Sequence, residues 1–147
     1  MVVEQEMNCP ECGATDDLCQ SRFDEFMALE FSNPAYYGTV HNLTVATYML
    51  QHSSKLTKEG WLYERELLRE FLVENKSPEY IRKQNKDLVD SGKRKSKITS
   101  KDGKRIIHKS AWTKTILDVR TVNAEVYGED IKAWARSALE DAREISL

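Results

Sequence analysis

Three cysteines lie within eleven residues near the start of the chain, and they are the residues best suited to chemistry. Cys9 and Cys12 form a Cys-x-x-Cys motif together with Pro10 and Gly13, and Cys19 follows. This spacing is typical of a turn that presents two thiolates to one tetrahedral metal ion. A redox role is not indicated, because the motif lacks a βαβ context. The cysteines therefore predict most of a zinc site, with one ligand missing.

The fourth ligand is expected from the three histidines of the chain. Helices predicted over residues 18–31 and 39–52 are joined by a short turn and have similar lengths, about 18 Å and about 17 Å. An antiparallel pairing would place His52, at the end of the second helix, beside Cys19, at the start of the first. His41 would then lie about 16 Å from His52.

We therefore predict a structural zinc site without an open coordination position. Its ligands are Cys9, Cys12, Cys19 and His52. His41 is the alternative fourth ligand, and we otherwise expect it to be a hydrogen-bonded histidine.

The elements that must position these residues are mostly helices. Apolar side chains recur at helical spacing in 18–31, 39–52, 57–74, 77–92 and the C-terminal segment 120–147. An Asp-Gly pair between β-prone runs predicts a small β-hairpin near 97–107. The sequence does not decide whether the segment 112–119 forms a further strand or an extended connection. The predicted fold class is mainly α: a helical bundle of about five helices with an N-terminal zinc knuckle and this hairpin.

Length and composition favour a single soluble domain over residues 1–147. We expect a zinc knuckle at 1–19, a helical core at 20–92, a basic hairpin and connection at 93–119, and the C-terminal helix at 120–147. No apolar run reaches the roughly 18 residues needed to span a bilayer, so no membrane partner is expected. An odd cysteine count and the lack of a signal-peptide pattern indicate the cytoplasm.

A net charge of −2 does not indicate nucleic-acid binding by the protein as a whole, but the charge is distributed unevenly along the chain. Residues 93–109 contain eight lysines or arginines and one acid. They could follow a phosphate backbone. We favour the other interpretation, a solvated edge hairpin whose lysines discourage strand pairing. The possible anion-binding residues are Lys93, Arg94, Lys95, Lys97, Lys104 and Arg105.

Several stretches of the chain resemble a family of uncharacterised bacterial proteins, a domain of unknown function. The resemblance rests on the Cys-Pro-x-Cys-Gly opening, the segment 30–36, and a helix that reads His-x-Leu-Thr-Val and later Tyr-x-x-Gln-His. It resumes at 115–119 and 132–135. It departs in the short spacing before Cys19 and in Ser53, where family members often have proline. The resemblance implies that the cysteines and the two histidines belong together, and it implies no activity.

Two functions are consistent with these residues. The first is a cytoplasmic zinc-binding interaction module, with a structural metal and an unknown protein partner. The alternative is a metal-dependent enzyme with a pocket between the first two helices, lined by Tyr36, Tyr37 and Tyr48. Its acid–base candidates would be Glu30, His41, Tyr48 and His52. Thiolate-rich ligation and the lack of a recognised catalytic signature favour the first. A small homo-oligomer is also possible, and the oligomeric state is not predicted.

Overall fold

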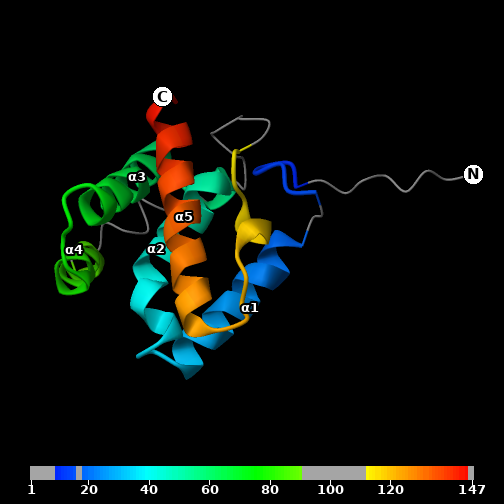
Figure 1. The fold of residues 1–147 in the computed structure, drawn as a ribbon. Helices are drawn as coiled ribbons and strands as arrows, with labels where there is room; N and C mark the ends of the chain where they lie inside the picture. Colours follow the sequence, from blue (N-terminus) through cyan, green and yellow to red (C-terminus); the bar gives the residue numbers. More distant parts are fainter. Residues whose placement is uncertain (1–8, 16–17, 91–111, 146–147) are drawn as a thin grey trace, which may run out of the picture.

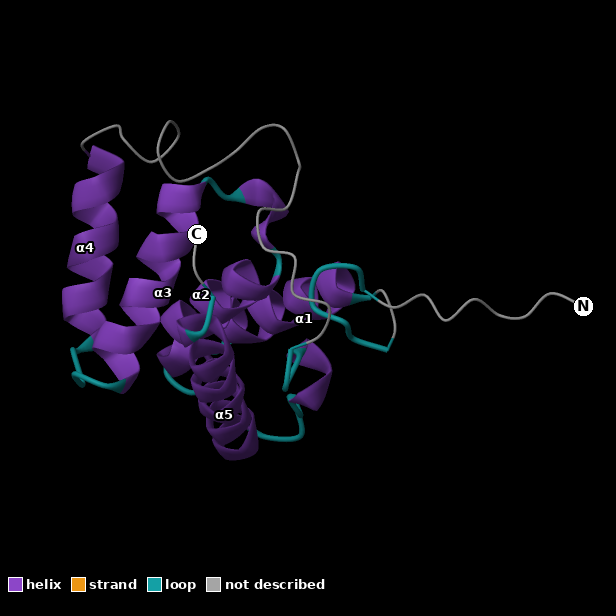
Figure 2. Cartoon of the chain, turned by 90° about the horizontal axis from the view of Figure 1, so that it is seen from above, coloured by secondary structure: helices purple, strands orange, loops and turns teal. Residues whose placement is uncertain are grey.

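The computed structural model describes residues 9–15, 18–90 and 112–145 of the 147-residue chain (Figure 1). The described residues form five α-helices: α1 (Cys19–Ser32), α2 (His41–Gln51), α3 (Lys58–Leu72), α4 (Pro78–Asp90) and α5 (Ala124–Arg143). They also form the short 3-10 helices η1 (Tyr37–Val40), η2 (Ser53–Lys55) and η4 (Ile116–Asp118). The mainly helical fold class is confirmed. The predicted β-hairpin near 97–107 lies outside the described residues, which themselves contain no strand (Figure 2).

Helix α2 lies at the centre of the structure. It packs most extensively against α3 and α5, and α4 lies beside α3 in both views (Figures 1 and 2). Seven of its residues are buried: Leu43, Thr44, Ala46, Thr47, Tyr48, Leu50 and Gln51. This burial on several sides makes α2 the scaffold for side chains at both of its ends.

Two buried tryptophans fasten the end of α2 to its neighbours. The indole N–H of Trp61 in α3 donates to the carbonyl oxygen of Leu50 at 3.0 Å. The indole N–H of Trp134 in α5 donates to Oε1 of Gln51, also at 3.0 Å. Both tryptophans have no exposed surface, so each indole N–H needs such an acceptor. The two bonds fix the C-terminal end of α2 relative to α3 and α5.

The helix boundaries follow from local chemistry. Thr57 caps α3, because its hydroxyl accepts from the backbone N–H of Gly60 at 3.0 Å. Asn123 caps α5 in the same way, through the N–H of Val126 at 2.9 Å. Helix α1 ends at Ser32, just before Asn33 and Pro34, where the residue ahead of a proline is disfavoured in helices.

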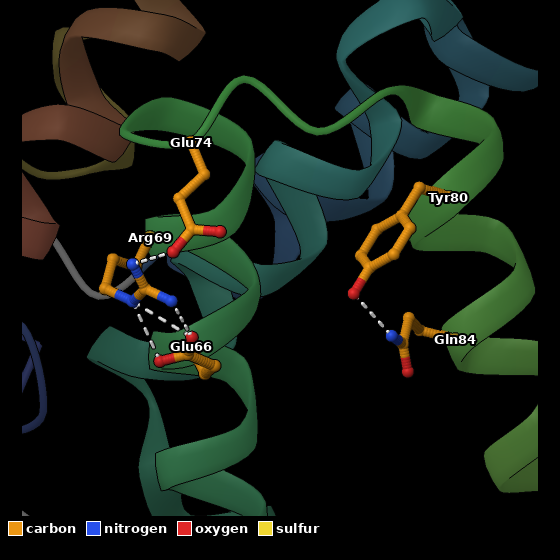
Figure 3. Close-up of polar contacts among 5 residues, drawn as sticks. All are labelled: Glu66, Arg69, Glu74, Tyr80 and Gln84. Carbon is orange, nitrogen blue, oxygen red and sulfur yellow. Dashed lines mark hydrogen bonds and ion pairs between the residues drawn. The ribbon is translucent and has the colours of Figure 1, made fainter.

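The end of α3 is held by surface ion pairs. Arg69 pairs with Glu66 and with Glu74, and its guanidinium lowers the pKa of the Glu66 carboxyl (Figure 3). In α4, the side-chain amide of Gln84 donates to the hydroxyl of Tyr80 at 2.8 Å (Figure 3). Such exposed contacts contribute little to the free energy of folding.

The segment 112–121 is an irregular connection that contains η4. Two aspartates of α5 bind it: Asp141 accepts from the backbone N–H of Thr113 at 2.8 Å, and Asp130 from that of Arg120 at 2.9 Å. Between them, Thr115 and Asp118 form a capping box around η4. Of the two interpretations left open for 112–119, the connection is therefore correct. No described helix is long and apolar enough to cross a membrane.

Candidate metal centre

The first part of the site is the knuckle turn around Cys9 and Cys12. The backbone N–H of Cys9 donates to the carbonyl of Ala14 at 3.0 Å, and that of Gly13 donates to the carbonyl of Cys9 at 2.9 Å. Gly13 has a φ of 81°, in the left-handed region that glycine enters without steric cost. The glycine therefore closes the turn that carries both cysteines.

Helices α1 and α2 supply the other two donors. Cys19 is the first residue of α1, and His52 directly follows α2. The two helices run antiparallel: Tyr48 lies against Gln20 near one end, and Thr44 against Glu30 near the other. The expected geometry is confirmed, because it brings His52 beside Cys19.

Four donor atoms converge at this point. Those of Cys9, Cys12, Cys19 and His52 all lie within 4.8 Å of one another, and the sulfurs of Cys12 and Cys19 are 3.5 Å apart. The residues are 5%, 0%, 3% and 7% exposed, respectively, so the cluster is closed to solvent. In a tetrahedral zinc site with Zn–S bonds of about 2.3 Å, neighbouring sulfurs are roughly 3.8 Å apart. The cluster could hold a metal ion of this size.

The ring of His52 is oriented by Tyr48. Its Nδ1 donates to the carbonyl oxygen of Tyr48 at 2.8 Å, and the two rings are stacked with their centroids 4.1 Å apart. Tyr48 stacks in turn on Phe23, also at 4.1 Å. The remaining nitrogen, Nε2, is buried and has no hydrogen-bond partner among the residues that the structure describes. A buried nitrogen without a partner, held among three sulfurs, fits a metal ligand whose other nitrogen fixes the tautomer.

The protonation equilibria also indicate a site suited to a cation. Hydrogen bonds from Cys12 and then Cys19 lower the pKa of the Cys9 thiol far below its ordinary value. Hydrogen bonds with Cys12 and then Cys9, followed by burial and the charges of the same two groups, raise the pKa of Cys19 far above it. Burial opposes a charge on His52, but Cys12 and Cys9 together raise its pKa to about 10. A metal cation would replace the protons held by Cys19 and His52.

Two contacts of the knuckle with the rest of the chain were not predicted. The Glu11 carboxylate accepts from the backbone N–H of Ser54 at 3.0 Å and from its hydroxyl at 3.2 Å. The backbone N–H of Trp112 donates to the carbonyl of Cys12 at 3.2 Å. Glu11 lies inside the knuckle motif, but no spacing rule links it to a serine 43 residues away. These bonds attach the turn to η2 and to the connection before η4.

The acid–base candidates of the enzyme hypothesis do not form one group. Glu30 and His41 are paired at the N-terminal end of α2, with Oε1 and Nδ1 2.7 Å apart, whereas Tyr48 and His52 belong to the cysteine end. The expected hydrogen-bonded role of His41 is confirmed. Of the aromatic residues proposed to line one pocket, Tyr37 packs on Tyr127, Tyr48 stacks on His52, and Tyr36 is exposed.

The possible anion-binding residues lie outside the described part of the chain. They are Lys93, Arg94, Lys95, Lys97, Lys104 and Arg105. Both interpretations of these residues, a solvated hairpin and an anion-binding surface, remain predictions that rest on their charge.

The fold and the cluster together define a mainly helical protein with three cysteines and one histidine that could hold a metal ion. A family model described as a family of unknown function (DUF5946) matches residues 7–143. The chain belongs to this family, and the resemblance to a family of uncharacterised proteins is confirmed. Searches of curated proteins and of solved structures gave no match.

Proposed function

We propose that this protein is a cytoplasmic interaction module whose fold is stabilised by a structural zinc ion. The observation that carries the proposal is the closed donor set of Cys9, Cys12, Cys19 and His52. Three thiolates and one imidazole are a ligand combination typical of structural zinc, whereas iron–sulfur clusters usually take four cysteines. Thiolates also require a reducing compartment, which supports the cytoplasm.

A structural role follows from where the ligands lie. The knuckle turn has few apolar side chains of its own, and the ion would join it to the start of α1 and the end of α2. Glu11 and Trp112 reinforce the same junction by hydrogen bonds. The metal would therefore fix three segments that are far apart in sequence. The alternative, a metal-dependent enzyme, needs an open coordination position, and four buried donors favour a closed one.

Exposed aromatic residues support the interaction role. Phe31, at the end of α1, and Tyr36, in the turn that follows, are each 70% exposed. Large aromatic side chains exposed in this way are enriched where proteins bind one another. We propose that the α1–α2 turn binds a partner protein. Nucleic acid binding through residues 93–109 is not favoured, because it rests on charge alone.

Metal analysis tests the first part of the proposal. Protein purified without a histidine tag should contain about one zinc ion per chain. Cys9→Ser and His52→Ala should lose the ion, and the matched control His41→Ala should retain it. The ligand assignment is wrong if His52→Ala keeps its metal while His41→Ala loses it.

Variants at the exposed aromatic residues test the second part. A Phe31→Ser/Tyr36→Ser double variant should lose a partner that the wild-type protein captures by cross-linking in cells. Val122→Ser, which replaces another residue that is mostly exposed, is the matched control. Equal capture by all three proteins would contradict a binding role for the α1–α2 turn.

A further inference from the structure

A second polar cluster is centred on Glu30, at the end of α2 away from the cysteines. Glu30 is only 1% exposed, and its Oε1 accepts from Nδ1 of His41 at 2.7 Å. Its Oε2 accepts from the hydroxyl of Thr44 at 2.6 Å and from that of Tyr127, in α5, at 2.5 Å. Burial and the adjacent Glu30 raise the pKa of Tyr127, which keeps its hydroxyl protonated and donating. Three hydrogen-bond donors therefore surround this one buried carboxylate.

This cluster determines which nitrogen of His41 is available to a ligand. A carboxylate only accepts hydrogen bonds, so Nδ1 of His41 carries a proton and donates it to Glu30. Nε2 is therefore the nitrogen that remains available to a ligand. The side chain of His41 is 35% exposed, and because Nδ1 faces a buried group, the exposed edge is the one with Nε2. No protein group of the described chain pairs with that atom. Phe31 lies against the same ring, with the centroids 5.1 Å apart.

His41 lines a cleft of about 300 Å³ between the α1–α2 turn, the start of α2 and the start of α4. This volume is near the lower limit for small-molecule sites. Thr39 and Asn42 contribute neutral polar groups, and Arg82 contributes a cation. Arg82 pairs with Glu79 at 3.2 Å, but both side chains are mostly exposed. An exposed pair of this kind is weak, so a ligand can compete for the guanidinium.

We propose that this cleft binds a small molecule through an oxyanion group, a phosphate or a carboxylate, held between Nε2 of His41 and the guanidinium of Arg82. Only a protonated ring can donate from Nε2 while Nδ1 donates to Glu30. A ring that starts neutral takes one proton from solvent as the anion binds, and the resulting imidazolium lies between two anions. Glu79 opposes the ligand until Arg82 turns away from it. The proposal does not depend on the metal centre.

The proton uptake gives the site a direction of pH dependence. The charged groups that face His41 are Glu30 behind the ring and Glu79 and Arg82 across the cleft, and the Thr44 and Tyr127 hydroxyls stay neutral. Because one proton is taken up together with the anion, binding should weaken as the pH rises.

Nuclear magnetic resonance of protein with 15N-labelled histidine tests the proposal. Inorganic phosphate and acetate are titrated separately at constant ionic strength, with sodium chloride as the reference salt. At least one anion should shift the His41 ring nitrogens to saturation and leave those of His52 unchanged. The anion that saturates identifies the oxyanion class. Shifts that follow sodium chloride for both anions would overturn the proposal.

Substitutions in the cleft provide the second readout. Arg82→Gln, which leaves the Glu30 cluster intact, should weaken binding about tenfold, the effect of one charge-assisted hydrogen bond. His41→Gln should abolish it, and the matched control Arg136→Gln, at an exposed residue of α5 outside the cleft lining, should bind like the wild-type protein. If His41→Gln does not fold, the anion affinity of Arg82→Gln still tests the site. Wild-type affinity in Arg82→Gln contradicts the site.

Discussion

The two ends of α2 carry the same residue in two different environments. At the C-terminal end, Nδ1 of His52 donates to a backbone carbonyl, and its buried Nε2 lies among three sulfurs. At the N-terminal end, Nδ1 of His41 donates to a buried carboxylate, and the opposite edge of the ring is exposed. Both rings are oriented through Nδ1, so orientation alone does not distinguish them. The two histidines differ instead in the groups around Nε2. The buried cysteine sulfurs around His52 suit a metal ion, whereas the open polar cleft beside His41 suits a soluble ligand.

The largest effect in this comparison should come from Cys12→Ser. Cys12 has no exposed surface, and the change removes a thiolate from a closed set of four donors. We expect loss of the metal and a fall of more than about 4 kcal/mol in the free energy of unfolding, because metal binding and folding are coupled. Metal analysis and denaturant unfolding measure both. The prediction is wrong if Cys12→Ser keeps its metal. It is also wrong if a chelator leaves the free energy of unfolding of the wild-type protein unchanged.

The pH dependence of metal binding should be the next largest effect. Without metal, the raised pKa values of His52, about 10, and of Cys19 mean that both groups hold a proton at neutral pH. Both protons must leave on ligation, so the metal-free protein binds more protons and affinity rises with pH. The slope should approach about a hundredfold per pH unit for two protons. Competition with a chromophoric chelator, together with proton-release calorimetry, checks it. A slope near zero would contradict ligation by these two groups.

Glu30→Gln should produce a smaller effect confined to the opposite end. The amide keeps one acceptor oxygen and places an NH2 group against donors, which leaves at least one buried donor unsatisfied. We expect a loss of about 2–3 kcal/mol in the free energy of unfolding with no change in metal content. The matched control is Glu25→Gln, an exposed glutamate of the same helix. If Glu30→Gln also loses metal, the two ends are coupled and the comparison fails.

The sequence allowed the cysteine end to be predicted far better than the Glu30 end. Cys-x-x-Cys is a local motif, and two helices of similar length joined by a short turn leave few positions for Cys19 and His52. Their convergence therefore needed only helix geometry. At the other end, the sequence indicates Glu30 only as an acid–base candidate of the enzyme hypothesis. Its partner Tyr127 is 97 residues away in sequence, and no local pattern encodes that contact.

The same distinction holds for the fold. Helix boundaries depend on caps and breakers, such as Thr57 and Pro34, that act within a few residues. The course of 112–121 depends instead on Asp130 and Asp141, which bind it from α5. Gln51 is a similar case, because its side chain joins Trp134 to the carbonyl of Lys114. Such tertiary hydrogen bonds have no periodicity that a sequence displays.

Two glycines allow the smallest effects at the two ends to be compared. Gly13→Ala places a Cβ on a residue with φ of 81°, which should cost about 1–2 kcal/mol. At the other end, a Cβ on Gly38 would lie 2.9 Å from the backbone carbonyl oxygen of Glu30, so Gly38→Ala must shift the backbone near the His41 pair. We expect a similar loss there. Denaturant unfolding measures the stability of both variants.

The two glycine variants should lose similar stability but differ in metal binding. Gly13→Ala should also weaken metal binding, because the turn that carries Cys9 and Cys12 is distorted, whereas Gly38→Ala should leave it unchanged. Gly128→Ala is the control, since a Cβ there meets nothing within 4 Å and the residue is inside α5. It should stabilise the protein by about 0.5–1 kcal/mol, because alanine has the higher helix propensity. Equal metal affinity in all three variants would show that the knuckle tolerates strain and that its geometry is set by the ion.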